Sequence, residues 1–281
     1  MRVDADRAAR TVTTAQENGA SMKNTSDRHG GRGPSRRRVT SLLAGAAAVL
    51  MVGGVAHAAP AADGGPERTA RAATLVKILP LGDSITAGWG GSGDWTGYRK
   101  PLLPLIQAPS RDVRFVGSQT SAFAPELRHE GYSGYTIQQL ETVVTRGSLV
   151  AKAAPDQILL HIGTNDMRLG LAAGAPERLE KLVREVNRQA PKARIHLASI
   201  IPIANPRLPV DAYNVGVQAV AKKLAGEGIP LTFVDMATAL TTADLGDGVH
   251  PNVTGYAKMA KVWAGSLEPL LPARNQAFVL A

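Results

Sequence analysis

Cysteine is absent from this chain of 281 residues, and aromatic residues make up only 4% of it. Without cysteine the protein has no disulfide bonds and no thiolate metal site, so its stability depends on a hydrophobic core. Blocks of Lys and Arg interleaved with aromatics are also missing after residue 72, which argues against nucleic-acid binding. These absences indicate a globular protein that is stabilised by its core alone.

The first 58 residues have the layout of an export signal. Three arginines (36–38) precede an apolar stretch of about 15 residues, and no charged residue occurs between them and Asp63. Residues 56–58, Ala-His-Ala, form a small-x-small cleavage site, so we expect cleavage after Ala58 and secretion from the cell. An uncleaved membrane anchor is the alternative. Because a membrane span needs roughly 20 apolar residues and this stretch is at the short edge of that length, we expect no stable membrane anchor.

The export route and the start of the chain leave alternatives open. The segment "SRRRVTSLL" resembles a twin-arginine signal, although Thr40 and Ser41 replace the Leu and Lys that this signal prefers. Both the twin-arginine and the general secretory route are therefore retained. Met22 begins a shorter and more ordinary signal and is an alternative first residue.

Removal of the signal changes the charge and the size of the protein. Residues 1–58 hold nine of the 32 Lys and Arg and four of the 23 Asp and Glu, so the remaining chain has a net charge of +4. Residues 59–73, rich in alanine, are interpreted as a flexible leader to a domain that covers 74–281. About 223 residues suit one α/β domain with a sizeable core.

Short apolar runs alternate with amphipathic segments of helical length along this domain. Strands are expected at 74–79, 112–117, 156–162, 194–201 and 231–234, and helices at 136–151, 175–190, 211–227 and 253–268. Strands separated by helices predict right-handed crossovers and a parallel sheet that is covered on both faces. Ligands of such sheets bind beyond the carboxyl ends of the strands.

Polar segments follow three of the expected strands. Ser84 ends "LGDS", "GTND" (163–166) follows the third strand, and "DGVHPN" (247–252) follows the fifth. A serine hydroxyl becomes a nucleophile when a histidine removes its proton and a carboxylate orients that histidine. Asp247 and His250 supply such a pair only three residues apart, so Ser84, Asp247 and His250 are the candidate catalytic residues.

Acyl transfer also needs hydrogen-bond donors for the oxyanion that develops on the carbonyl oxygen. The backbone N–H of Ser84, the backbone N–H of Gly134 in "GYSGYT" and the carboxamide of Asn165 are the candidate donors. Gly134 as a turn glycine and Asn165 as the centre of an Asx-turn are the structural alternatives.

Together and in this order, the four blocks closely resemble the SGNH hydrolases, also called the GDSL esterase family. The resemblance implies a three-layer α/β/α sandwich with a five-stranded parallel sheet, the flavodoxin-like SGNH fold. It also implies that Ser84, Gly134, Asn165 and His250 are the functional residues, with Asp247 as the partner of His250. It implies a serine esterase, and the lack of clustered metal ligands in the sequence predicts that the reaction needs no metal; no cofactor is expected.

The substrate class follows from a narrower resemblance and from aromatic residues. The segments "RFVGSQ", "HEGYSGYTI" and "DGVHPN" are similar to the secreted acetylxylan-esterase-type branch of this family. Trp89, Trp95 and Tyr132 flank the expected site, and such side chains suit a sugar. We therefore expect a monomeric esterase that removes acetyl groups from a polysaccharide such as xylan. A lipase or esterase of lipid and other small esters, and an exported carbohydrate-binding domain that does not use its esterase fold, are the alternatives.

Other motifs are less informative. "GWGGSG" (88–93) matches a dinucleotide fingerprint, but it begins too far beyond the strand and no clear helix follows it. A G-x-S-x-G elbow is missing, which disfavours the α/β-hydrolase fold. His129, His161 and His196 lack metal-ligand spacing and are interpreted as strand and loop histidines.

Overall fold

The computed structural model of the chain describes residues 73–91 and 93–274. The predicted export signal, its cleavage site and the leader up to residue 72 lie outside the described residues. Within the described ranges, no helix combines the length and the apolar character that a membrane crossing requires.

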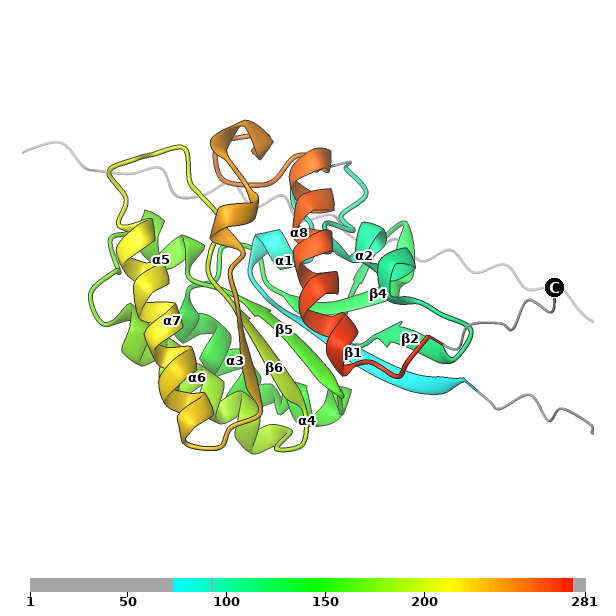
Figure 1. Cartoon of the computed structure of the whole chain (residues 1–281). Coiled ribbons are helices and arrows are strands. Elements are labelled where there is room, and N and C mark those ends of the chain that lie inside the picture. The colour runs from blue at the N-terminus through cyan, green and yellow to red at the C-terminus, as the bar shows by residue number, and fades with distance from the viewer. Residues whose placement is uncertain (1–72, 92, 275–281) are drawn as a thin grey trace, which may run out of the picture. The chain divides into compact units, whose positions relative to one another are not determined.

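A seven-stranded sheet forms the centre of the domain, in the order β3-β4-β2-β1-β5-β6-β7. Its strands are β1 (Thr74–Gly82), β2 (Arg111–Phe115), β3 (Gln119–Ser121), β4 (Ala124–Gly131), β5 (Gln157–His161), β6 (Arg194–Ala198) and β7 (Leu231–Val234). The pairings are parallel except for the antiparallel pair β3–β4. Helices lie on both faces of this sheet (Figure 1), so the predicted α/β sandwich is confirmed.

The predicted strand count of five is too low, because β3 and β4 escape the sequence pattern. β3 has only three residues, and β4 reads "APELRHEG", without a clear apolar run. β2 pairs with the first part of β1, from Thr74 to Ile78, whereas β4 pairs with its last residues, Leu81 and Gly82. The two strands therefore succeed one another along the same edge of β1, which only the tertiary structure determines.

The helices that follow the longer amphipathic patterns agree with the prediction, and short ones were missed. The helices are α1 (Ser84–Ala87), α2 (Arg99–Ile106), α3 (Ile137–Gly147), α4 (Leu149–Ala153), α5 (Thr164–Arg168), α6 (Ala175–Gln189), α7 (Val210–Gly226) and α8 (Val253–Leu267). The helix expected over 136–151 is broken at Ser148, whose φ of 48° is left-handed. α2 was missed because Pro104, inside it, is a helix breaker in sequence.

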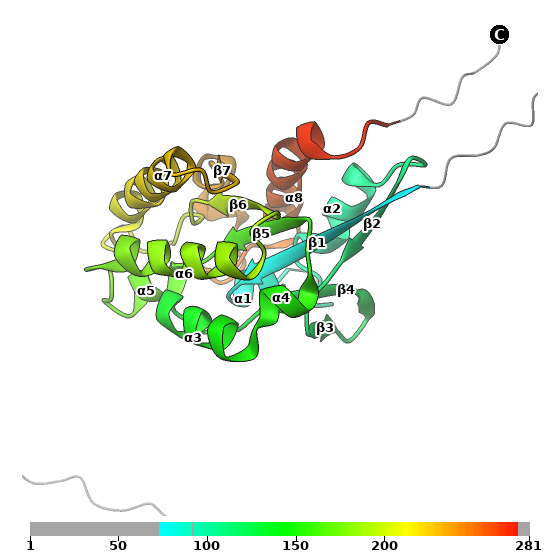
Figure 2. The same ribbon diagram turned by 90° about the horizontal axis from the view of Figure 1, so that it is seen from below.

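The alternating side chains of β1 build two separate cores. Leu79 and Leu81 pack with α3, α4, α6 and α7, whereas Val76 and Ile78 pack with α2 and α8. Figure 2 shows α3, α4 and α6 on one side of the sheet and α2 and α8 on the other. Because the centre of a parallel sheet is buried on both faces, every residue of the central strand β5 is buried.

The site begins where β1 and β5 end side by side. Gly82 pairs with His161 in the parallel register, and a Cβ added to Gly82 would lie 2.2 Å from the His161 carbonyl oxygen. No residue larger than glycine fits there. The close approach brings the chain after β1, with Ser84, next to the chain after β5, with Asn165.

Candidate active site

Ser84 is the first residue of helix α1, directly after the end of β1. The side chain of Asp83 caps this helix by accepting a hydrogen bond from the Ile85 N–H at 3.0 Å. Ser84 is largely buried, with 8% of its surface exposed. The helix cap and the tight strand end therefore hold the hydroxyl in one place.

Ser84, His250 and Asp247 form a continuous hydrogen-bonded chain. Ser84 Oγ lies 2.8 Å from His250 Nε2, and His250 Nδ1 lies 2.7 Å from Asp247 Oδ2. Asp247 Oδ1 accepts the backbone N–H groups of Val249 at 3.0 Å and of His250 at 2.7 Å. The carboxylate thus holds both the ring and the backbone of His250.

The electrostatics of Asp247 determine the direction of these hydrogen bonds. Partial burial favours its neutral form, but hydrogen bonds from the His250 amide, the His250 ring and the Val249 amide outweigh it and lower the pKa of Asp247 to about 2. The ionised carboxylate accepts a hydrogen bond from Nδ1–H, which leaves Nε2 as an acceptor for the Ser84 hydroxyl. This arrangement is suited to removing the hydroxyl proton.

Asn165 of α5 is hydrogen-bonded to the loop before α3 that contains Gly134. The turn 132–135 is closed by the Tyr135 N–H and the Tyr132 carbonyl at 3.2 Å, and Gly134 has a left-handed φ of 81° within it. Asn165 Nδ2 donates to the Tyr135 carbonyl at 3.0 Å, and Arg168 donates to Asn165 Oδ1 at 3.3 Å. One hydrogen of the carboxamide is occupied in this way, which leaves the second for a ligand.

Asp166, which the sequence did not identify as a site residue, holds the end of the same loop through a hydrogen bond to the start of α3. It is fully buried, and its Oδ2 accepts the Ile137 N–H at the start of α3 at 2.9 Å. Arg178 of α6 pairs with its Oδ1 at 3.1 Å. Neighbouring residues of "GTND" thus hold the two ends of one short segment. No sequence signal identifies these partners, because they are 29 and 12 residues away.

Asp83, whose role the sequence leaves open, is a buried acid. Burial raises the pKa of Asp83 to about 7, against the opposing effect of the hydrogen bond from the Ile85 amide. Its Oδ2 and the Thr164 hydroxyl are both buried, and the interaction with this hydroxyl also opposes the rise in the pKa of Asp83. The capping pattern of Asp83 is the signal in the sequence that points to its structural role.

Aromatic side chains border the triad. The Trp89 and Trp95 rings meet edge to face with centroids 4.7 Å apart, and the Trp89 ring lies 6.0 Å from that of His250. Tyr132 stacks on Tyr135 at 5.0 Å in the Gly134 loop. Trp89 is 43% and Trp95 39% exposed, so these rings are available to a ligand.

The remaining sequence motifs belong to the framework. Gly91 of "GWGGSG" donates its N–H to the Pro251 carbonyl at 3.1 Å, so this segment packs against the loop that contains His250. His129, His161 and His196 are buried on strands, and burial lowers the pKa of His161 to about 4. Over the described ranges, no cluster of three or more acidic, histidine or cysteine side chains has metal-binding geometry.

Comparison with known proteins identifies the family. Residues 81–258 match the model of the GDSL-like Lipase/Acylhydrolase family. The multidomain esterase of Ruminococcus flavefaciens is 33% identical over 238 residues, which cover 74% of this chain but only 30% of that protein. The thioesterase 1/protease 1/lysophospholipase L1 of Escherichia coli (strain K12) is 28% identical over 210 residues, 72% of this chain and 88% of that protein.

A solved structure agrees with this result. The Clostridium thermocellum family 3 carbohydrate esterase superimposes with a TM-score of 0.62 at 28% identity, over 70% of this chain and 97% of that one. The family match covers all the segments around Ser84, Gly134, Asn165 and His250. The chain therefore belongs to the GDSL-like lipase/acylhydrolase family and is a carboxylic ester hydrolase with the SGNH fold.

Proposed function

We propose that this protein is a secreted serine esterase that removes short acyl groups, acetyl above all, from a polysaccharide such as xylan. The observation that carries the proposal is the chain of hydrogen bonds from Ser84 Oγ to His250 Nε2 at 2.8 Å and from His250 Nδ1 to Asp247 at 2.7 Å. A nucleophile, its base and the group that orients the base are thus in contact without a ligand.

The reaction proceeds in two steps. His250 Nε2 takes the hydroxyl proton as Ser84 Oγ attacks the ester carbonyl carbon, and the C=O electron pair moves to the oxygen. The N–H groups of Ser84 and Gly134 and the free hydrogen of the Asn165 carboxamide stabilise this oxyanion. Collapse breaks the C–O bond to the alcohol, which receives the proton from His250. Water then attacks the acyl-enzyme by the same route and releases the acid and Ser84.

The aromatic side chains around the triad support a carbohydrate substrate. Indole and phenol rings pack on the C–H faces of a sugar while its hydroxyl groups remain free for hydrogen bonds. Trp89 lies against His250 and is exposed, so a sugar bound on it would be next to the reacting ester. The 28% identity to a family 3 carbohydrate esterase agrees with this substrate class.

A substrate panel tests the acyl and alcohol preferences. We expect hydrolysis of 4-nitrophenyl acetate to exceed that of the octanoate and palmitate, and we expect acetate release from acetylated xylan. The Ser84→Ala protein is the control for both, and activity that survives this substitution would exclude the mechanism. Loss of activity on treatment with EDTA would contradict a metal-free reaction.

Hydrolysis of lipid esters is the second candidate, since the Escherichia coli relative is a thioesterase and lysophospholipase by name. A preference for palmitate, together with no acetate from xylan, would favour it. A serine-reactive organophosphonate tests the non-enzymatic alternative. Stoichiometric labelling of Ser84 supports an enzyme, and the absence of labelling supports a carbohydrate-binding domain.

Export is proposed from residues 1–58 alone. We expect the protein in the culture medium to be a monomer that begins at Ala59, as intact mass spectrometry and size-exclusion chromatography would show. The variant Arg36→Lys/Arg37→Lys distinguishes the two routes, because it blocks the twin-arginine route and leaves general secretion intact. Retention of the uncleaved chain in membranes would indicate the anchor instead.

A further inference from the structure

We propose that a cavity of about 410 Å³ at the end of helix α1, which Ala87 lines, is the subsite for the sugar ring that carries the ester. This inference rests on the proposed function and specifies where its alcohol part binds. We call the cavity the hairpin pocket, because the β3–β4 hairpin supplies much of its lining. Its lining includes Trp95, Gln119, Thr120, His129, Tyr132 and Ser133.

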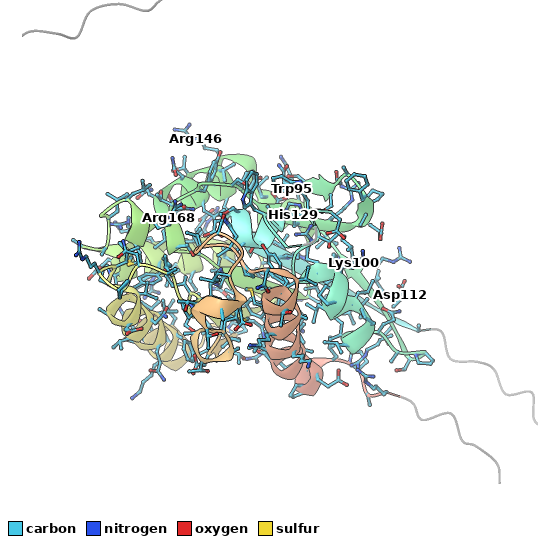
Figure 3. All side chains as sticks on the ribbon, turned by 90° about the horizontal axis from the view of Figure 1, so that it is seen from above. Trp95, Lys100, Asp112, His129, Arg146 and Arg168 are labelled. Atoms are coloured by element: carbon cyan, nitrogen blue, oxygen red, sulfur yellow. The ribbon has the colours of Figure 1, made fainter. Side chains whose placement is uncertain are left out.

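Residues on two sides of the hairpin pocket are connected to the candidate active site. Trp95 contacts Trp89, which in turn lies against the His250 ring. On the other wall, Ser133 directly precedes Gly134. Figure 3 shows Trp95 and His129 together near the helix that Ser84 begins, and Ala87 at the end of that helix also lines the pocket. A ring held here is thus adjacent to the reacting ester.

The hairpin pocket is lined by aromatic and polar side chains but by no charged ones. His129 Nδ1 accepts the Gly131 N–H at 3.0 Å, so the neutral ring carries its proton on Nε2. Burial and the charge of Arg99 lower the pKa of His129 to about 3, which keeps the ring neutral. Gln119 and Thr120 add an amide and a hydroxyl, and the lining contains no carboxylate, ammonium or guanidinium.

This lining matches the chemistry of a sugar better than that of an acyl chain. Two aromatic walls provide apolar faces for the ring C–H groups, whereas the amide and hydroxyl groups match its hydroxyls. An acyl chain would leave these polar groups unpaired, which costs binding free energy. The volume also falls within the roughly 300–1,000 Å³ of small-molecule sites.

The wall that contains Trp95 is held in one conformation. Trp95 has a left-handed φ of 57°, which is strained for a side chain of its size. The buried Arg99 donates to the Trp95 carbonyl at 2.8 Å and to Ser121 Oγ at 2.6 Å, and Ser121 Oγ also donates to that carbonyl at 2.5 Å. Strain that the surroundings maintain in this way is typical of a preformed binding site.

A second cavity beside the same loop provides a matched control. It has a volume of about 550 Å³ and lies along the outer face of α3, where Thr142 and Arg146 line it. It also reaches Tyr135 but neither of the two tryptophans. Thr120→Trp fills the hairpin pocket from an exposed strand position that tolerates aromatic residues, and Thr142→Trp fills the control cavity.

The experiment compares the two variants on two esters, acetylated xylan and ethyl acetate. We expect Thr120→Trp to lower kcat/KM for acetylated xylan on the order of tenfold or more, mainly through KM, because the ring is excluded. Its kcat/KM for ethyl acetate should remain near that of the unmodified protein. Thr142→Trp should leave both unchanged. Gln119→Ala, which opens the pocket, should weaken only the activity on the xylan ester.

Each other result overturns the subsite. If Thr120→Trp lowered kcat/KM equally for both esters, or did not lower it for acetylated xylan, the sugar would bind elsewhere. The same conclusion would follow if Thr142→Trp lowered the activity on xylan instead, or if Thr120→Trp changed the acyl preference from acetate toward octanoate. A binding measurement separates this inference from the proposed function. If the unmodified protein releases no acetate from xylan, the function fails. The subsite would still be supported if a xylo-oligosaccharide bound to the Ser84→Ala protein and if adding Thr120→Trp weakened this binding. Binding that Thr120→Trp leaves unchanged, or no binding at all, would overturn it.

Discussion

At the scale of single residues, each member of the triad is held by more than one contact. Asp247 uses one carboxylate oxygen for the ring of His250 and the other for two backbone N–H groups. Ser84 is held by the cap that Asp83 forms on α1. Substitutions at these positions should therefore change the chemistry more than the fold.

The triad residues should lose activity as a unit. Ser84→Ala and His250→Ala should each lower kcat by on the order of 10⁴-fold or more. The double variant should lower it no further, because the first change removes the nucleophile and the second removes the base that activates it. Asp247→Asn should cost less. Steady-state kinetics with 4-nitrophenyl acetate measures all four proteins. A double variant far below either single one would mean that Ser84 and His250 act independently.

The carboxamide of Asn165 should act in the transition state. Asn165→Ala should lower kcat by about 10²–10³-fold with little change in KM, because an oxyanion donor is needed most when charge develops. Asn165→Asp keeps the shape but replaces the donor with an acceptor, so it should lose at least as much. A change in KM alone would make Asn165 a substrate-binding residue.

At the scale of elements, the N-terminus of α3 is attached to two other helices. Asp166 of α5 accepts the Ile137 N–H, and Arg178 of α6 neutralises the buried carboxylate. The Gly134 turn directly precedes α3. The position of the proposed oxyanion donors thus depends on how α3, α5 and α6 pack together.

Removal of Arg178 should therefore destabilise the domain. Arg178→Met leaves the Asp166 carboxylate buried without its counter-charge, and breaking a buried ion pair in this way costs about 3–5 kcal/mol. Urea denaturation would measure the change in the free energy of unfolding. Arg188→Met on the same helix is the control, since its side chain is 68% exposed and its ion pair should contribute less than about 1 kcal/mol.

A double variant checks the cause of that loss. Asp166→Asn/Arg178→Met removes both charges, so it should recover part of the stability that Arg178→Met loses. The free energy of unfolding of the double variant could instead be lower than the sum of the two single changes predicts. In that case the stability lost in Arg178→Met would come from the packing of the Arg178 side chain and not from its charge.

At the scale of the whole molecule, titratable groups in the core couple stability to pH in opposite directions. The pKa of Asp83 is raised from 3.8 to about 7, so its contribution is fully present below pH 3.8 and is lost as the pH rises toward 7. Burial lowers the pKa of His161 and of His196 to about 4, so these residues reduce stability as the pH falls from 6.5 toward 4.

The variant Asp83→Asn isolates the first effect. It lacks the titrating acid, so its melting temperature relative to that of the unmodified protein should rise between pH 4 and pH 7.5. Thermal unfolding followed by circular dichroism at several pH values would measure this difference. A difference that is constant over this range would mean that the buried carboxyl does not change its protonation there.

The helix and strand pattern could be predicted where burial follows a simple period. α6, α7 and α8 agree with their expected ranges to within a residue or two, because each packs one apolar face against the sheet. β3 and β4 could not be predicted, since strands this short or this polar depend on pairing with β1 and with one another. The pocket proposed for the sugar lies on this unpredicted hairpin.

The sequence by itself determined which chemistry is available, because residue type and order along the chain suffice for that. Ser84, Asp247 and His250 are predicted as nucleophile, orienting acid and base from the four sequence blocks taken together, and Gly134 and Asn165 as candidate donors. Only the tertiary structure decided what surrounds them. Asp166 meets Ile137 and Arg178, and Trp95 and Tyr132 line the same cavity, although they come from distant segments. Such contacts depend on how the sheet and helices pack, which no local pattern encodes.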